Sequence, residues 1–294
     1  APIHLPAGFE QAPKILAMGS ELKNTFCLLN NGRAILSQHL GDLENATALI
    51  AYQETLKLYL DLFEQQPEAI AIDQHPEYLS TKFGQELAVE KSLPLHSIQH
   101  HHAHVAACMA ENGVPLDSPA VLGIALDGLG LGEDGTLWGG EFLLADYRQS
   151  QRLARFKPVA MLGGAQAIYQ PWRNTYAHLL AAFTWEELQS TYGDLELIQF
   201  LDRQPRSLLD QMLQKGMNSP QASSAGRLFD AVAAAIGVCR EKVSYEGQAA
   251  IQLEALIQPE DLELAQPYPF HLINLKENQR NSQPLLELEP QLFW

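Results

Sequence analysis

The same order of expected strands and helices occurs twice along the chain, and this repeat limits the fold more than any other feature. Each copy opens with three apolar runs separated by turn residues, the pattern of a three-stranded meander. Each copy also has a polar or glycine-rich loop between its first two strands, at 19–24 and at 127–135. The first copy is expected to contain strands at 14–18, 25–30 and 33–38, a helix through Tyr52, Leu56, Tyr59 and Phe63, a strand at 68–72, a helix at 79–90, a strand at 95–98 and a helix at 101–111. The second is expected to contain strands at 120–126, 137–146 and 152–157, helices at 175–183, 185–192, 207–215, 228–237 and 247–257, and a further strand at 268–275.

Two similar lobes that each offer a turn at a strand end can hold a polyphosphate from both sides. The expected fold class is therefore α/β, with the duplicated lobes of the actin-like ATPases (the ASKHA plan) on ribonuclease-H-like cores. We expect a first lobe at 1–118 and a second lobe with helical insertions at 119–294. The second copy lacks a clear counterpart of the closing strand–helix–strand, so we expect it to be incomplete at its C-terminal end. The alternative is an ordinary α/β domain followed by an α+β domain.

Charge and composition argue against several classes of partner. The chain has 19 basic and 35 acidic residues, a net charge of −16, which disfavours nucleic acid and anionic membranes. Its longest apolar stretch, 231–239, is far shorter than the ~20 residues of a membrane span, and its N-terminus does not have the pattern of a signal peptide. The three cysteines, Cys27, Cys108 and Cys239, lie far apart, which predicts neither a disulfide framework nor a thiolate zinc site. A reducing cytoplasm is the expected compartment.

Four histidines in five residues open the expected helix at 101–111. His100 and His104 are four residues apart, so both imidazoles project from one helix face. This spacing suits two nitrogen ligands of one metal ion, whereas His101 and His102 are expected to point elsewhere. A polar helix start without a metal is the alternative.

Asp127 is the candidate for a third, oxygen ligand of the same ion. It follows an apolar strand and precedes Gly128, and the carboxyl end of a strand faces the ligand crevice in open α/β sheets. A mixed nitrogen and oxygen site favours iron, manganese or zinc over calcium. The alternative is a turn-forming Asp-Gly pair.

Glycines in this loop and on the strand that follows it are candidates for contact with an anion. Gly128, Gly130, Gly139 and Gly140 allow backbone amides to approach a phosphate closely, and Lys23 in the opposite loop would neutralise its charge. Two segments, 223–230 and 245–248, start helices whose N-termini suit ribose and phosphate. Helix capping is the alternative for both.

Several long segments resemble the HypF carbamoyltransferase family, which matures [NiFe]-hydrogenases. The clearest are QHHHAHVAACMAENG (99–113), LDGLGLGEDGTLWGGEFLLADY (126–147), SSAGRLFDAVAAAIGV (223–238) and SYEGQAAIQLEAL (244–256). Shorter matches are GSELKNTFCL (19–28), QHLGDLEN (38–45) and HPEYLST (75–81). The resemblance is to the carbamoyl-transfer domain of the family, not to its acylphosphatase-like, zinc-finger and adenylate-forming parts. It also implies that the chain ends before a last segment that carries a second glycine loop and a further metal-binding aspartate.

The resemblance implies an activity. Carbamoyl-adenylate, made elsewhere from carbamoyl phosphate and ATP, would bind with its adenosine near Gly226, Asp230, Glu246 and Gly247. Its phosphate would approach Lys23 and the four glycines named above, beside a divalent metal (Fe, Mn or Zn) on His100, His104 and Asp127. The C-terminal cysteine of the partner protein HypE would take the carbamoyl group, which becomes the cyanide ligand of hydrogenase iron.

Three positions depart from the family pattern. The chain has Leu129 in place of a threonine, Ala165 in place of an acidic residue, and Gln170 in place of a glutamate. The first change removes a hydroxyl near the expected anion, and the other two each remove a charge. Two alternative functions follow: a carbamoyltransferase that acts on a small-molecule hydroxyl, and a catalytically incomplete remnant that binds nucleotide or a partner.

Overall fold

The computed structural model describes residues 2–275 and 284–294. The chain separates into two compact units, of which the first runs up to Leu122 and includes Leu144–Ser150. The second unit contains Gly123–Leu143 and Gln151–Trp294. This division does not test the lobe boundary expected between residues 118 and 119, which stays a prediction.

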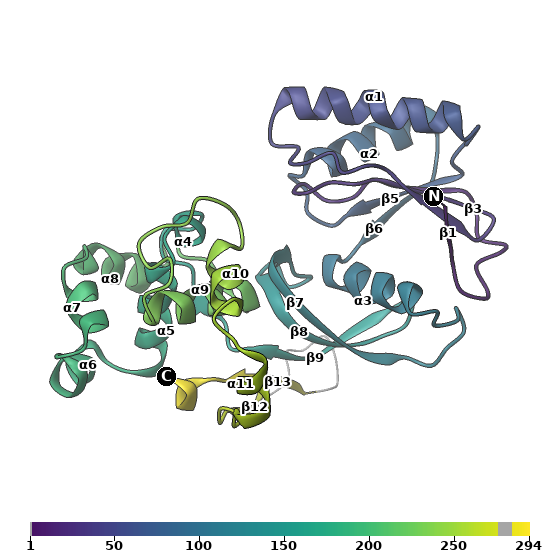
Figure 1. Cartoon of the computed structure of the whole chain (residues 1–294). Coiled ribbons are helices and arrows are strands. Elements are labelled where there is room, and N and C mark those ends of the chain that lie inside the picture. Colours follow the sequence, from purple (N-terminus) through teal and green to yellow (C-terminus); the bar gives the residue numbers. More distant parts are fainter. Residues whose placement is uncertain (1, 276–283) are drawn as a thin grey trace. The chain divides into compact units, whose positions relative to one another are not determined.

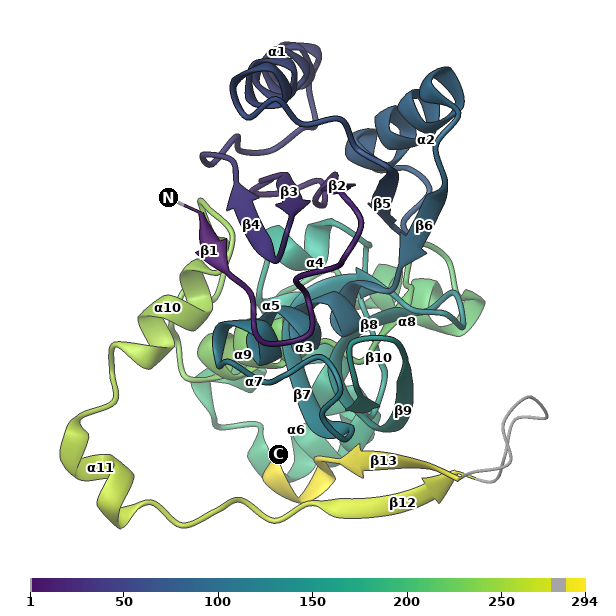
Figure 2. The same cartoon turned by 90° about the vertical axis from the view of Figure 1, so that its right-hand side faces the viewer.

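Unit 1 is a mixed sheet covered by helices. Its strand order is β1-β4-β3-β2-β5-β6; the neighbours from β1 to β2 pair antiparallel, whereas β2, β5 and β6 pair in parallel. Helices α1 and α2 lie on one face of this sheet (Figures 1 and 2). The elements are β1 (Ile3–His4), β2 (Ile15–Ala17), β3 (Cys27–Asn30), β4 (Arg33–Leu36), α1 (Ala46–Leu62), β5 (Ala69–Asp73), α2 (Leu79–Lys91), β6 (Leu95–Ile98) and α3 (His100–Glu111).

Local signals in the sequence explain where these elements begin and end. Asn31 and Gly32 both adopt positive φ, 48° and 69°, and so close the hairpin between the strands expected at 25–30 and 33–38. The Asn45 side chain accepts a hydrogen bond from the Ala48 N–H at 2.9 Å and starts α1. Helix α2 ends at Lys91, and the next residue, Ser92, caps it with a left-handed backbone conformation.

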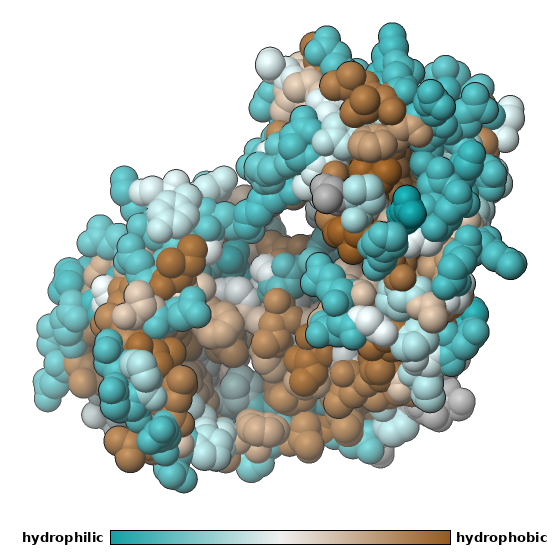
Figure 3. Space-filling model, turned by 45° about the vertical axis from the view of Figure 1, so that its right-hand side comes forward, coloured by the Kyte–Doolittle hydropathy of each residue, from teal (hydrophilic) through white to brown (hydrophobic). Residues whose placement is uncertain are grey.

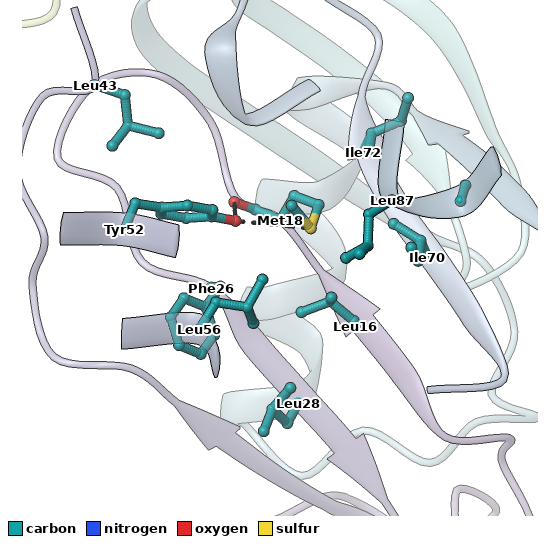
Figure 4. Packing of buried hydrophobic residues seen from close by; sticks show 11 residues of the cluster. Leu16, Met18, Phe26, Leu28, Leu43, Tyr52, Leu56, Ile70, Ile72 and Leu87 are labelled. Atoms are coloured by element: carbon teal, nitrogen blue, oxygen red, sulfur yellow. Dashed lines mark hydrogen bonds between the residues drawn. The ribbon is translucent and has the colours of Figure 1, made fainter. Parts of the chain in front are cut away.

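The core of unit 1 lies between the sheet and its two helices (Figure 4). Tyr52 from α1 is fully buried, and its hydroxyl donates to the Met18 carbonyl at 2.9 Å. Burial raises the pKa of this hydroxyl far above its usual range, so it remains a donor. The bond fixes α1 to the end of β2, where the loop at 19–24 begins. Other members of the cluster are Leu16, Phe26, Leu28, Leu43, Leu56, Ile70, Ile72, Leu87 and Ala88.

Unit 2 contains a second sheet and a group of helices. The strand order is β10-β11-β8-β9-β13-β12, and β7 pairs with β8. Its elements are β7 (Val121–Leu131), β8 (Leu137–Ala145), β9 (Ser150–Phe156), β10 (Val159–Ala160), α4 (Gln166–Tyr169), α5 (Trp172–Ala182), α6 (Trp185–Tyr192), α7 (Glu196–Asp202), α8 (Arg206–Lys215), β11 (Gln221–Ala222), α9 (Ala225–Ala235), α10 (Gln248–Glu254), α11 (Pro259–Leu264), β12 (His271–Leu275), β13 (Leu285–Glu289) and a 3₁₀ helix (Gln291–Phe293). The strands β10, β11 and β13 and the helices α4, α7 and α11 were not expected from the sequence.

The structure corrects the expectation for β7. The strand does not end at Asp127 but continues to Leu131. The sequence pattern did not indicate this extension, because glycines in an extended segment add no apolar side chains to it. The turn is confined to the residues around Gly135, whose N–H donates to the Gly132 carbonyl at 2.9 Å. Nor is β7 continuously buried, since Leu122, Ile124 and Leu126 are more than half exposed. Figure 3 shows that other apolar residues (brown) also lie at the surface of the protein.

Among the described residues, the longest helix is α1 with 17 residues, and none has the length and apolar character that a membrane crossing requires.

Replacing Tyr52 by phenylalanine tests the link between α1 and β2. We expect Y52F to lower the free energy of unfolding by about 1 kcal/mol, because one buried hydrogen bond is lost. The matched control is Y59F, whose hydroxyl donates to the Gln38 Oε1 at the surface; it should change stability by less than about 0.5 kcal/mol. Urea unfolding at constant slope measures both, and equal midpoints for the two variants would contradict the assignment.

Candidate functional site

The first cluster of polar residues lies at one edge of the unit 1 sheet. Strands β5 and β6 are parallel neighbours, and Asp73, the last residue of β5, lies opposite Ile98, the last residue of β6. Helix α3 starts at His100, directly after Gln99, whose side chain accepts the His102 N–H at 2.8 Å. Because parallel strands end at the same edge, Asp73 and the first turn of α3 meet there.

Two of the four histidines direct ring nitrogens at each other. His100 Nδ1 lies 2.7 Å from Asp73 Oδ2, and His100 Nε2 lies 3.2 Å from His104 Nε2. Two nitrogens bound to one ion at about 2.0–2.1 Å, with an angle between octahedral and tetrahedral, are about 2.9–3.4 Å apart. The two rings therefore share one helix face, as the four-residue spacing predicted, at a separation that one divalent cation could bridge. That they bind a metal stays a prediction.

The other two histidines have different contacts, as expected. His101 is fully buried, and its Nδ1 lies 3.1 Å from the Gln99 Nε2. His102 Nε2 lies 2.6 Å from the Asp146 carbonyl oxygen and holds the turn between β8 and β9 against α3. The Tyr147 hydroxyl supports the same turn by donating to the Val114 carbonyl at 2.7 Å.

The loop that carries Lys23 is fixed by side chains of its own unit. Lys23 adopts a positive φ of 49°, and its N–H donates to Asp42 Oδ1 at 2.8 Å, while its side chain is exposed. Glu21 Oε2 accepts the Leu79 N–H at 2.6 Å, which joins the loop to the start of α2. The buried Asn24 amide donates to the Met18 carbonyl at 3.1 Å.

In unit 2 the expected glycines pack backbone against backbone. A Cβ atom on Gly139 would lie 2.7 Å from the Asp127 carbonyl oxygen, and one on Gly226 would lie 2.9 Å from the Gly128 Cα. The start of α9 and the strands β7 and β8 thus approach as closely as only glycine permits. This brings Asp127, Gly128, Gly139 and Gly226 together within one unit.

The remaining expected glycines divide into closed and open positions. A Cβ atom on Gly140 would meet the Ser223 carbonyl oxygen at 2.5 Å, and Gly130 is buried within β7. A Cβ atom on Gly128 would have no atom within 4 Å beyond those of Gly128 and its two chain neighbours, and the Gly128 N–H donates to Asp127 Oδ1 at 2.6 Å. Gly139, Gly140 and Gly226 have packing roles, whereas the side of Gly128 where a Cβ would stand is open.

A buried ionic network supports this cluster and was not found from the sequence. Glu141 is fully buried on β8, and its Oε2 accepts from the Arg152 Nε at 2.6 Å. Its Oε1 accepts from the Ser223 hydroxyl, directly before α9. Arg152 also pairs with Asp134 at 3.0 Å and lies 4.0 Å above the Trp138 ring, which joins the network to the β7–β8 turn.

Helix α9 carries a carboxyl group with unusual surroundings. The Ser224 side chain accepts the Arg227 N–H at 3.0 Å and caps the helix. Asp230 is 4% exposed, and its Oδ2 lies 2.9 Å from Arg227 Nε without the angle of a hydrogen bond. Burial raises the pKa of Asp230 to about 6, although Arg227 opposes the change. Among the described residues, Oδ2 thus remains a buried acceptor without a hydrogen bond.

The segment before α10 is placed beside α9. Gly247 has a φ of 76° and stands directly before α10, whereas Glu246 is exposed. Ala249 of α10 packs with Ala233 of α9 in one buried cluster. Both expected helix starts are therefore present in unit 2.

Fold and clusters together define a two-lobed α/β protein of the actin-like type. The family model of the HypF Kae1-like domain matches residues 10–111, and that of the carbamoyltransferase, Kae1-like domain, second subdomain, matches residues 123–289. The second match covers more than half of the chain. The chain therefore belongs to the HypF carbamoyltransferase family.

Individual relatives agree with this family. The chain is 46% identical over 252 residues to carbamoyltransferase HypF of Rhodobacter capsulatus, covering 86% of this chain and 33% of that protein. It is 39% identical over 283 residues to HypF of Synechocystis sp., covering 93% of this chain and 35% of that protein. The chain thus spans about a third of the length of these relatives.

Two solved structures have the same fold. One is full-length HypF in the phosphate- and nucleotide-bound form, with a TM-score of 0.80 and 36% identity, covering 99% of this chain and 35% of that one. The other is HypF of T. kodakarensis, with a TM-score of 0.74 and 33% identity over 86% of this chain and 33% of that one.

The pH dependence of stability tests the environment of Asp230. Its pKa is about 6 in the folded protein and ordinarily 3.8, so the folded state binds more protons between these values. The free energy of unfolding should fall as the pH rises from 4 to 7, with at most roughly 3 kcal/mol from this residue. In D230N this contribution vanishes, so the variant gains stability over the wild type as the pH rises. A pH-independent difference between the two denaturation curves would contradict the raised pKa.

Proposed function

We propose that this chain transfers a carbamoyl group from carbamoyl-adenylate to a cysteine thiol, as the carbamoyl-transfer part of a HypF protein. The observation that carries the proposal is the pair of imidazole Nε2 atoms 3.2 Å apart at the edge of the unit 1 sheet. Membership of the HypF family supports the type of reaction.

The metal ligands in this proposal are His100, His104 and Asp127. The donor set of two imidazoles and a carboxylate suits iron, manganese or zinc. When bound, such an ion supplies a Lewis acid that polarises a carbamoyl or phosphate oxygen. Asp127 is half-buried and lies beside the open side of Gly128, which supports its role as the oxygen ligand.

The adenosine of the donor would bind along α9 and the start of α10. Asp230 Oδ2 is a buried acceptor without a hydrogen bond among the described residues, which suits a ribose hydroxyl. Glu246 and Gly247 stand at the start of the adjacent helix α10, and Gly226 lies in the first turn of α9. The nucleotide in the full-length HypF structure supports a nucleotide ligand for this chain.

Lys23 and Gly128 are the proposed contacts of the donor phosphate. Lys23 supplies a positive charge, and Gly128 lies next to space for an anion. The other glycines, Gly130, Gly139 and Gly140, form the rigid backbone support of that place. Substrate orientation and charge stabilisation are then the protein's contribution to catalysis.

The acceptor in this proposal is the C-terminal cysteine of HypE, and the compartment is the cytoplasm. The sulfur attacks the carbamoyl carbon and forms a C–S bond, while the bond from that carbon to the AMP phosphate oxygen breaks. AMP leaves with the electron pair, and the thiol proton passes to solvent. The thiocarboxamide product is the precursor of the hydrogenase cyanide ligands.

A transfer assay tests the proposed function. The chain is mixed with carbamoyl-adenylate, made from carbamoyl phosphate and ATP by a HypF relative that lacks its own transfer domain, and with a peptide ending in the HypE cysteine. We expect mass spectrometry to show one carbamoyl group on the peptide thiol, and an equal amount of AMP to be released. H104A should lower the rate at least about 10²-fold because the imidazole pair is lost. H39A, which removes an exposed histidine of the same unit, should leave the rate unchanged.

Two results would contradict the proposal, and they correspond to the alternative functions. Carbamoylation of sugar or antibiotic hydroxyls without thiol modification would indicate a small-molecule carbamoyltransferase. AMP binding without turnover would indicate a binding remnant. The departures from the family pattern bear on the second alternative: Leu129 packs in an apolar cluster, whereas Gln170 Oε1 still accepts from the Arg173 Nε at 2.5 Å.

A further inference from the structure

We propose that Asp73 is a positioning residue that holds His100 in the tautomer with its proton on Nδ1, so that Nε2 carries the lone pair with which an imidazole binds a cation. The inference rests on the proposed function, because it concerns how one of the proposed metal ligands is oriented. Asp73 was not singled out as a site residue by the sequence, and its partner lies 27 positions away.

Three hydrogen bonds hold Asp73 and the end of β5 in place. Its Oδ1 accepts the His75 N–H at 2.8 Å, and its backbone carbonyl accepts the Thr81 hydroxyl at 3.2 Å. The next residue, Gln74, donates its N–H to the Ile98 carbonyl at 3.1 Å, which ties the end of β5 to the end of β6. The Asp73 side chain is 8% exposed, so its second oxygen, Oδ2, has a fixed direction toward His100.

The chemistry of the pair selects one tautomer. An ionised carboxylate only accepts hydrogen bonds, so at 2.7 Å from Asp73 Oδ2 the His100 Nδ1 must donate. In a neutral imidazole the proton on Nδ1 leaves a lone pair on Nε2, the atom that lies 3.2 Å from His104 Nε2. Carboxylate partners of this kind fix the ring and raise the basicity of the metal-binding nitrogen, and their loss costs about 10–100-fold in metal affinity.

An asparagine at position 73 would reverse this selection. Its Oδ1 can still accept the His75 N–H, but its amide nitrogen then faces His100 Nδ1 and donates to it. The proton of the neutral ring moves to Nε2, which points at His104 and no longer has a lone pair for a cation. D73N thus keeps the shape of the side chain, reverses the polarity of one hydrogen bond and removes one negative charge.

Nitrogen NMR of the metal-free protein tests the tautomer directly. Histidine is labelled with ¹⁵N, and long-range proton–nitrogen correlation spectra are recorded at a pH at which imidazoles are neutral. These spectra distinguish a protonated from an unprotonated ring nitrogen. In the wild type we expect His100 to have its proton on Nδ1, and in D73N on Nε2. The control D117N makes the same substitution at an exposed residue of unit 1 and should retain the wild-type tautomer.

Metal titration measures the consequence. Competition with a chromophoric chelator, with Zn²⁺ or Mn²⁺ as the probe, should show binding to D73N that is about 10–100-fold weaker than to the wild type or to D117N. Backbone NMR spectra that match the wild type exclude a merely structural effect of D73N. If D73N does not fold, the wild-type tautomer alone decides: a proton on Nε2 of His100 overturns the proposal.

The outcomes separate this inference from the proposed function. The expected tautomers in wild type and D73N support the role of Asp73 even if the wild type binds no metal, a result that would remove the proposed metal site. Tight metal binding by the wild type, with the same affinity and the same tautomer in D73N, overturns the role of Asp73 and leaves the metal site intact.

Discussion

The parallel pairing of β5 with β6 is the contact on which the rest of the unit 1 site depends. It puts Asp73 and the beginning of α3 at one edge, and the hydrogen bond from Gln74 to Ile98 holds the two strand ends together. The helix then sets the distance between His100 and His104, and Asp73 fixes the ring of the first. A shift of one residue in this register would separate the carboxylate from the imidazole. The geometry of this histidine pair and its carboxylate is thus a consequence of sheet pairing and not of the histidines alone.

Unit 2 reaches its rigidity in a different way. Glycines allow β7, β8 and α9 to touch through their backbones, and the buried Glu141 joins Ser223, before α9, to Arg152 on β9. A buried carboxylate is tolerated only when its charge is paired, and here it has both an arginine and a hydroxyl as partners. The network thus connects β8, β9 and the start of α9, the elements that pack around Gly139 and Gly226. A preorganised backbone of this kind is what charge stabilisation during catalysis requires.

The sequence predicted best the features that depend on local periodicity. The HxxxH spacing fixed which two histidines share a helix face, and Asn31-Gly32 fixed the hairpin. Contacts between distant residues were missed, because no local pattern signals them: Asp73 with His100 is one case, and Glu141 with Ser223, 82 positions apart, is another. The prediction that β7 ends at Asp127 was wrong, because glycines carry no side chain by which an extended segment is recognised. The short strands β10 and β11, of two residues each, also escape any pattern.

The central claim is that His100 and His104 hold one cation. Anomalous scattering from crystals of this protein soaked in Mn²⁺ or Zn²⁺, recorded at the absorption edge of the metal, tests it most directly. The account predicts a single strong peak about 2.0–2.2 Å from the Nε2 atoms of both histidines, with an Asp127 oxygen as a further ligand. A map without a peak between these rings, or with the metal bound only elsewhere, would contradict it.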